Sequence, residues 1–112
     1  MLHKMKLQKA PFENIKKGEK KIELRLYDKK RRKVKIGDKI EFSKLPDLKE
    51  KITVDVEALL LYKNFSELIG DISAKDLGYR EEDKDYLIES MYDYYTKKEE
   101  KRWGVVGIKI SL

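Results

Sequence analysis

Residue types on which whole classes of protein depend are scarce in this chain of 112 residues. It has no cysteine, which excludes a disulfide framework and a thiolate metal site. His3 is its only histidine, so we expect neither histidine-based zinc chemistry nor a Ser-His-Asp triad. Apolar runs stay far below the ~20 residues of a membrane span, and no apolar signal region follows Met1. We therefore expect a cytoplasmic protein, away from membranes, that uses neither a metal ion nor another cofactor.

Charge, in contrast, is abundant, since 43% of the residues are charged and the net charge is +6. Up to Phe42 the chain holds 15 basic and six acidic residues, a net charge of +9, whereas the remainder carries −3. A basic half indicates a positive face for a polyanion such as RNA. A lysine-rich composition typical of heat-stable proteins explains the same counts, so both interpretations stay open.

The most informative stretch runs from Gly18, which predicts a turn, to residue 27. Apolar residues at 22, 24 and 26 alternate with polar ones at 21, 23, 25 and 27, which predicts a half-buried strand. Its polar face places the carboxylate of Glu23 beside the guanidinium of Arg25, with Lys20 and Lys21 close by. A solvated strand face accounts for the same charges. The functional alternative makes Lys20, Glu23 and Arg25 candidate catalytic residues.

The rest of the chain predicts short strands and helices within one domain, residues 1–112. Alternation predicts strands over 4–7, 39–42 and 51–62. The last of these should contain a bulge where its alternation breaks. The nearly continuous apolar run at 103–110 predicts a final strand in the sheet interior. Pro11 and Gly18 bracket a short helix over 11–17. Capped turns follow at 64–70, at 73–78 with Ser73 as cap and Gly78 as stop, and at 96–99.

The main helix is predicted over residues 81–95, with Leu87, Met91, Tyr94 and Tyr95 on its buried stripe. Its tyrosines serve either core packing or a stacking platform for bases. The five consecutive cations at 29–33 form either a solvated loop or a phosphate-contacting one.

The ordered set of elements and motifs resembles the ASCH domain family of PUA-like β-barrels. The signature combines a glycine with three charged residues at the spacing GxKxxExR: Gly18, Lys20, Glu23 and Arg25. The supporting motifs are Pro11–Phe12, Gly37–Asp38 and Trp103–Ile108. The resemblance covers nearly the whole chain. It implies an α+β, mainly β fold: a PUA-like β-barrel of five to six strands flanked by two to four helices.

The resemblance also implies a cleft lined by the signature residues and a link to RNA or nucleosides. We therefore expect a small RNA- or nucleotide-binding protein, monomeric rather than oligomeric. The binding residues would be cations of the cleft and of the basic loop: Lys20, Lys21, Arg25, Lys30, Arg31 and Arg32. We expect the pair formed by Glu23 and Arg25 to be solvent-accessible, so that Arg25→Ala costs only about 0–1 kcal/mol of stability.

Two enzymatic functions and one binding function remain as alternatives. Similar proteins hydrolyse N4-acetylcytidine with a lysine, a threonine nucleophile and a glutamate. Their lysine matches Lys20 and their motif arginine matches Arg25, but Glu23 stands in place of the threonine, and their glutamate falls near Asp76. A ribonuclease would not need the threonine. A protein-interaction module would use the tyrosine-rich helix.

Overall fold

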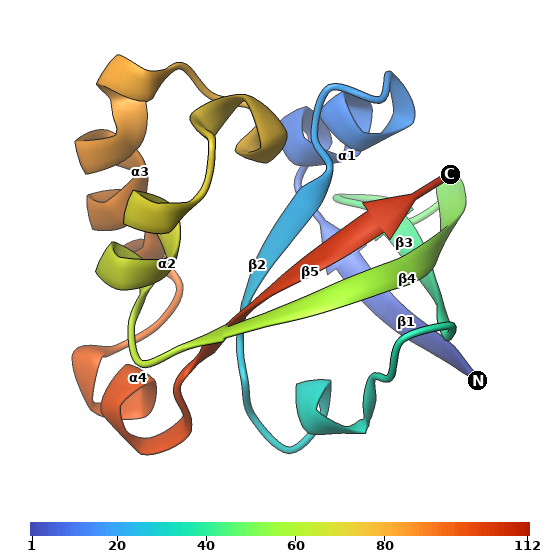
Figure 1. The fold of residues 1–112 in the computed structure, drawn as a ribbon. Helices are drawn as coiled ribbons and strands as arrows, with labels where there is room; N and C mark the ends of the chain where they lie inside the picture. Colours follow the sequence, from blue (N-terminus) through green and yellow to red (C-terminus); the bar gives the residue numbers. More distant parts are fainter.

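Five strands form one curled sheet in the computed structural model, which describes residues 1–112 (Figure 1). Strands β1 (Leu2–Leu7) and β3 (Lys39–Lys44) pair in parallel. Antiparallel ladders then join β3 to β4 (Lys51–Tyr62), β4 to β5 (Val105–Ser111) and β5 to β2 (Ile22–Leu26). The sheet order β1-β3-β4-β5-β2 leaves β1 and β2 as unpaired edges, so the curled sheet is a half-barrel.

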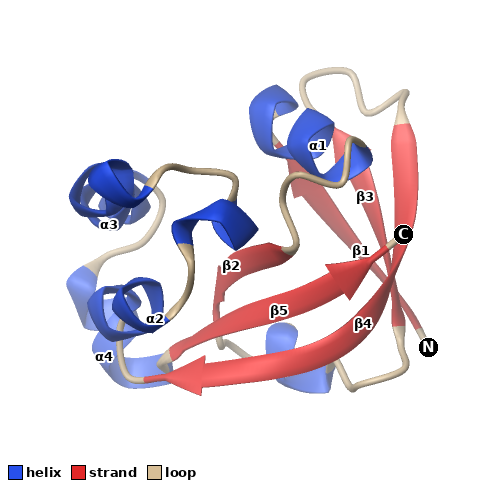
Figure 2. Cartoon of the chain, turned by 45° about the horizontal axis from the view of Figure 1, so that its top comes forward, coloured by secondary structure: helices blue, strands red, loops and turns tan.

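The helices lie on two sides of this half-barrel (Figure 2). Helix α1 (Lys9–Lys16) stands beside β1 and β3, whereas α2 (Phe65–Asp71), α3 (Lys84–Ser90) and α4 (Lys97–Trp103) gather beside β2 and the neighbouring ends of β4 and β5. Four short 3-10 turns complete the fold: Arg31–Lys33, Ala74–Leu77, Glu81–Asp83 and Met91–Asp93. The predicted α+β fold is thus confirmed, with five strands and four α-helices. No helix is long and apolar enough to cross a membrane.

Two hydrophobic clusters, one on each side of the sheet, decide which way the β2 side chains point. A cluster of 12 buried residues fills the curl of the sheet, and one of 11 residues joins the sheet to α2 and α3. The β2 residues Ile22, Leu24 and Leu26 belong to the second cluster. Because strand side chains alternate, Glu23 and Arg25 face the concave side of the half-barrel.

Several local predictions agree with the structure in detail. Strand β4 spans the predicted residues, and its register shifts between Val56 and Ala58, where a bulge is predicted. Both hydrogen bonds of the capping box between Thr96 and Glu99 are present at the start of α4. Gly78 ends the preceding turn in the left-handed conformation, although the Ser73 side chain makes no capping hydrogen bond.

The predicted main helix over 81–95 is wrong as one element, because it divides into a 3-10 turn, α3 and a second 3-10 turn. The Ser90 hydroxyl donates to the carbonyl of Leu87 at 2.7 Å, and the backbone tightens after that residue. The apolar stripe therefore ends at Met91, which is buried, whereas Tyr94 is 65% exposed. The final strand is also shorter than predicted, since Trp103 ends α4 and Val105 begins β5.

A charged cluster and a cavity beside strand β2

The turn between α1 and β2 fixes the position of Lys20. The Asn14 carbonyl accepts hydrogen bonds from two successive amides, that of Lys20 at 3.0 Å included. Gly18 adopts φ 78° there, a conformation that a β-carbon disfavours. The Lys21 amide then donates to the carbonyl of Asp76 at 2.8 Å, which ties the turn to the helical side of the molecule. Strand alternation leaves the direction of Lys20 undecided, and these bonds decide it.

Lys20, Glu23 and Arg25 form one buried charged cluster. The Arg25 Nε donates to one carboxylate oxygen of Glu23 at 2.8 Å, and the Lys20 Nζ lies 3.3 Å from the other. The Glu23 residue is only 5% exposed and Lys20 only 7%. The expectation of a solvent-accessible pair is therefore wrong, because α1 and the helical segment cover this edge of the sheet. Two cations around one carboxylate leave the cluster with a net charge of +1.

The cluster keeps its carboxylate ionised. Burial by itself raises the pKa of Glu23, but Arg25 and then Lys20 outweigh that cost and lower the pKa below its ordinary value. Burial likewise disfavours the charged form of Arg25, and the neighbouring Glu23 more than offsets it and raises the pKa of Arg25. At neutral pH, Glu23 is therefore a hydrogen-bond acceptor and a poor proton donor.

Arg25 also closes the opening between the unpaired edge strands. Its Nη2 donates to the backbone carbonyl of Lys6 in β1 at 2.8 Å, while its Nε holds Glu23. Further along the same edge, the Lys30 Nζ donates to the carbonyl of Lys4 at 2.8 Å. Two backbone carbonyls of the β1 edge, which has no neighbouring strand there, are therefore bonded by side chains.

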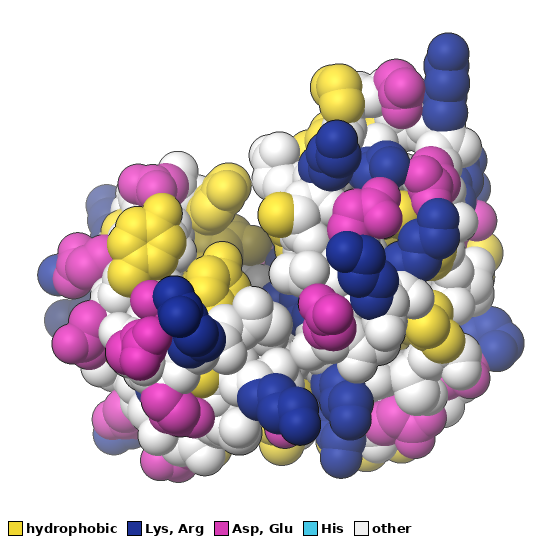
Figure 3. All heavy atoms as spheres, turned by 90° about the horizontal axis from the view of Figure 1, so that it is seen from above, with side chains coloured by type: hydrophobic (Ala, Val, Ile, Leu, Met, Phe, Trp, Pro, Cys, Tyr) yellow, Lys and Arg dark blue, Asp and Glu magenta, His cyan; other side chains and the backbone are white.

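A cavity of about 410 Å³ opens above this cluster, within the size range of small-molecule sites. Its walls come from the end of β1, from α1, from β2 and from residues 77–95. Figure 3 shows the surface hollowed between the helical side and the α1 side, with hydrophobic side chains along the helical wall. Lys20, Glu23 and Arg25 all line the cavity, together with Lys6 and Asp93. The three predicted catalytic candidates thus share one concave surface.

Four tyrosines line the same cavity: Tyr79, Tyr86, Tyr94 and Tyr95. Tyr86 and Tyr94 are 70% and 65% exposed, which is unusual for rings that serve core packing. Burial raises the pKa of Tyr79, and Tyr86 and Tyr94, which line the same cavity, add to that effect. Tyr95 instead stacks on Phe65 with 5.7 Å between ring centroids. The cavity therefore combines a charged floor with an aromatic rim.

Gly78 allows the helical segment to approach Lys20 closely. A β-carbon at Gly78 would stand 3.3 Å from the Asn14 side-chain nitrogen and 3.5 Å from the Lys20 β-carbon. Gly78 also has φ 83°, so two separate constraints favour glycine there. This close approach helps to hold Lys20 over Glu23.

Other predicted site residues lie outside the cavity. Lys21 is exposed and absent from the cavity wall, and Asp76 contributes only its carbonyl to this region. In the basic loop, the Arg31 guanidinium bonds the carboxylate of Asp28 at 3.0 Å, and Arg32 bonds the carbonyl of Trp103 at 3.0 Å. The loop cations Lys30, Arg31 and Arg32 therefore flank the site rather than enter it. No group of three or more His, Asp or Glu side chains is placed to hold a metal ion.

Sequence reasoning missed most of the cavity wall. Lys6 and Asn14 show no pattern that singles them out, and Asp93 is one acid among many in a charged helix. The tyrosines could have indicated a binding surface, because a helix with tyrosines on several faces has more aromatic surface than one core can bury. Their position beside β2 is needed to locate that surface, and the sequence does not give it.

The model of the ASCH domain family matches residues 5–112. The chain belongs to the ASCH domain family. Among solved structures, it is similar to the hypothetical protein PH0355, at 34% identity over 99% of this chain and 98% of that one, with a TM-score of 0.86. It is also similar to protein PF0455 from Pyrococcus furiosus, at 35% identity over 99% and 96% of the two chains, with a TM-score of 0.77.

A more distant ASCH structure shares the fold alone. The S128A mutant of ZmASCH from Zymomonas mobilis matches with a TM-score of 0.70 at 13% identity, over 99% of this chain and 68% of that one. A comparison with curated proteins finds no match.

Proposed function

We propose that this ASCH domain protein binds RNA by holding one nucleotide in the cavity beside β2. The observation that carries the proposal is the meeting of two kinds of group in one concavity: the buried cluster of Lys20, Glu23 and Arg25, and the exposed rings of Tyr86 and Tyr94. The cluster supplies donors and an acceptor, and the rings supply stacking surfaces. A nucleobase needs both.

The chemistry of the cluster suits a base edge that carries a donor and an acceptor side by side. The ionised Glu23 accepts from an exocyclic amine, and the cations donate to a ring nitrogen or a carbonyl oxygen. The net charge of the cluster attracts the phosphates of the same strand. The flanking cations Lys30 and Arg31 add to that attraction, because Lys30 lies close to both Arg25 and Arg31 and bonds the Lys4 carbonyl at the β1–β2 opening.

Binding fits this cluster better than hydrolysis of N4-acetylcytidine. A threonine nucleophile is missing, because Glu23 occupies that position of the signature. The hydroxyl of Ser90 in the cavity wall donates to the backbone of its own helix. The lowered pKa of Glu23 makes it an unsuitable general acid at neutral pH.

Binding isotherms of nucleosides, including N4-acetylcytidine, of nucleoside monophosphates and of short RNAs test this proposal. The informative variants are Tyr86→Ala and Tyr94→Ala, because both rings are exposed and their removal leaves the core intact. Removing each stacking ring lowers affinity by roughly 1–3 kcal/mol, which is at least about fivefold. Ile36→Ala is the matched control, since Ile36 is 67% exposed and lies outside the cavity. The proposal is wrong if no nucleotide binds, or if both tyrosine variants bind like the control.

A further inference from the structure

A second groove, of about 490 Å³, lies at the end of α4, and it combines cations with an aromatic ring. Lys63, Lys101, Arg102 and Trp103 line it. Trp103 is the only tryptophan of the chain and is partly exposed. None of these four residues lines the cavity beside β2.

The arginines around Trp103 are held in place by aromatic rings. The Arg102 guanidinium lies over the Trp103 ring at 4.8 Å from its centroid. The Arg32 guanidinium lies 5.8 Å from the same ring and 4.4 Å from that of Tyr27, while its Nη2 donates to the Trp103 carbonyl. A guanidinium fixed in this way loses little entropy when it binds a phosphate, and its flat face offers a stacking surface for a base.

The groove is basic, although one carboxylate lines it. Glu100 is 6% exposed, and its oxygens accept hydrogen bonds from the Phe65 amide at 2.9 Å and from the Tyr92 hydroxyl at 3.0 Å. Its charge is thus engaged within the fold, whereas Lys63, Lys101 and Arg102 are exposed. This surface favours the binding of a ligand that carries both negative charge and an aromatic ring.

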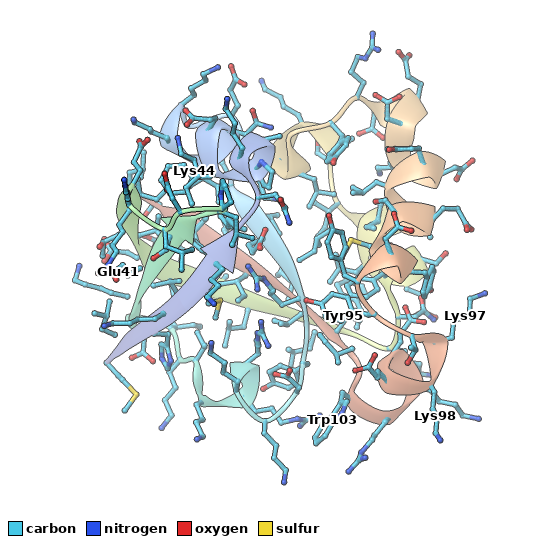
Figure 4. The ribbon with its side chains drawn as sticks, turned by 180° about the vertical axis from the view of Figure 1, so that it is seen from behind. Glu41, Lys44, Tyr95, Lys97, Lys98 and Trp103 are labelled. Carbon is cyan, nitrogen blue, oxygen red and sulfur yellow. The ribbon has the colours of Figure 1, made fainter.

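The groove lies within reach of a strand that occupies the cavity. Tyr95 lines the cavity and directly precedes the Thr96 cap of α4, and Trp103 ends the same helix. Seven helical residues span about 10 Å. Figure 4 shows Tyr95 and Trp103 on the same side of the molecule, with Trp103 below. At about 3.4 Å per nucleotide, the rise of a stacked strand, that interval corresponds to at most about three nucleotides, and a strand with unstacked bases covers it with fewer.

We propose that the Trp103 groove is a second subsite that binds a neighbouring nucleotide of the single strand whose base occupies the cavity. This inference rests on the proposed function and names its ligand class as single-stranded RNA of two or more nucleotides. A duplex is disfavoured, because its stacked bases leave no face free for the tyrosines or the guanidinium groups. Between the two subsites the strand follows α4, from Tyr95 in the cavity wall to Trp103 in the groove.

The lone tryptophan provides a site-specific readout. Titration of the full chain with cytidine monophosphate and with oligocytidylates of two to eight nucleotides, followed by Trp103 fluorescence and by calorimetry, separates the two subsites. We expect affinity to rise at least about fivefold between one and about four nucleotides and then to level off. Fluorescence should change only with the longer ligands. Arg102→Gln should remove the length-dependent gain without affecting the mononucleotide, whereas Lys98→Gln, an exposed change on the same helix, should leave both unchanged.

The outcomes distinguish this inference from the proposed function. If the mononucleotide binds but longer strands bind no tighter and Trp103 fluorescence stays constant, the second subsite is wrong and the cavity assignment stands. If no ligand binds, both proposals are wrong. If oligonucleotides change Trp103 fluorescence while Tyr86→Ala and Tyr94→Ala have no effect, the groove is a binding site and the cavity is not.

Discussion

Replacing Arg25 with alanine should destabilise the protein far more than the removal of a surface ion pair. Arg25 is the closest partner of Glu23, which is 5% exposed, and it also bonds the Lys6 carbonyl across the opening of the half-barrel. Removing one partner of a buried ion pair costs about 3–5 kcal/mol, and the remaining Lys20 favours the lower end of that range. For a domain of this size, about 3 kcal/mol lowers Tm by roughly 10 °C or more.

The destabilisation should depend on pH with a defined sign. In the wild type the pKa of Glu23 lies below its ordinary value of 4.5, so its ionisation stabilises the fold above that pH and ceases to do so as pH falls. Without Arg25, burial outweighs more of the remaining attraction, and the pKa of Glu23 rises. The destabilisation caused by Arg25→Ala should therefore be largest near neutral pH and smaller at about pH 3.5, because Glu23 takes up its proton at a higher pH in the variant than in the wild type.

Chemical denaturation followed by circular dichroism at these two pH values measures both effects. Arg80→Ala is the matched control, because Arg80 is 79% exposed and pairs with Glu82 and Asp83 on the surface. That control should cost no more than about 1 kcal/mol. If Arg25→Ala lowers the free energy of unfolding no more than Arg80→Ala does, or if its effect does not change with pH, Arg25 does not stabilise a buried, ionised Glu23. Should Arg25→Ala fail to fold, Arg25→Lys tests the same pH dependence with one charge retained.

Three further predictions concern other parts of the molecule. Glu23→Thr should give at most weak hydrolysis of N4-acetylcytidine, measured by release of acetate, because Asp76, which falls near the position of the second carboxylate, lies outside the cavity wall; turnover comparable with an efficient esterase would contradict this. Alanine at positions 30–32 should lower the log–log salt dependence of RNA binding by roughly 0.7 for each phosphate that is no longer neutralised, and an unchanged slope would make that loop a solvated connection. Ultraviolet titration should find Tyr92 ionising at about pH 12, because burial and then Glu100 raise its pKa to about 12; in Glu100→Gln that pKa should fall, and no change would exclude the pairing.

The strands were the most predictable part of this fold. Alternation of apolar and polar residues is a local signal, so β4 and its bulge near Val56 could be located from the sequence. The same alternation placed Glu23 and Arg25 on one face of β2. The capping box at Thr96 was equally local, since its two hydrogen bonds join residues three apart.

Burial and long-range placement could not be predicted in the same way. The depth of Glu23 depends on helices distant in sequence that cover the edge of β2. The expected cost of about 0–1 kcal/mol for Arg25→Ala was based on a solvent-accessible pair, which the structure contradicts. Lys20 owes its direction to the Asn14 carbonyl and to the close approach of Gly78. Tyr94 left its predicted stripe because the helix tightened after Ser90 and turned the ring towards the cavity.

The most direct test of the central claim is a residue-resolved map of nucleotide binding. An amide chemical-shift titration of the full chain with a pyrimidine nucleoside monophosphate provides one. We predict that the largest shifts cluster on the cavity wall, at residues 20–25 and 77–95, and that residues 51–57 of β4 stay unchanged. Shifts confined to the basic loop at 29–33, or spread evenly over the lysine-rich surface, would contradict the assignment of the cavity as the RNA-binding site.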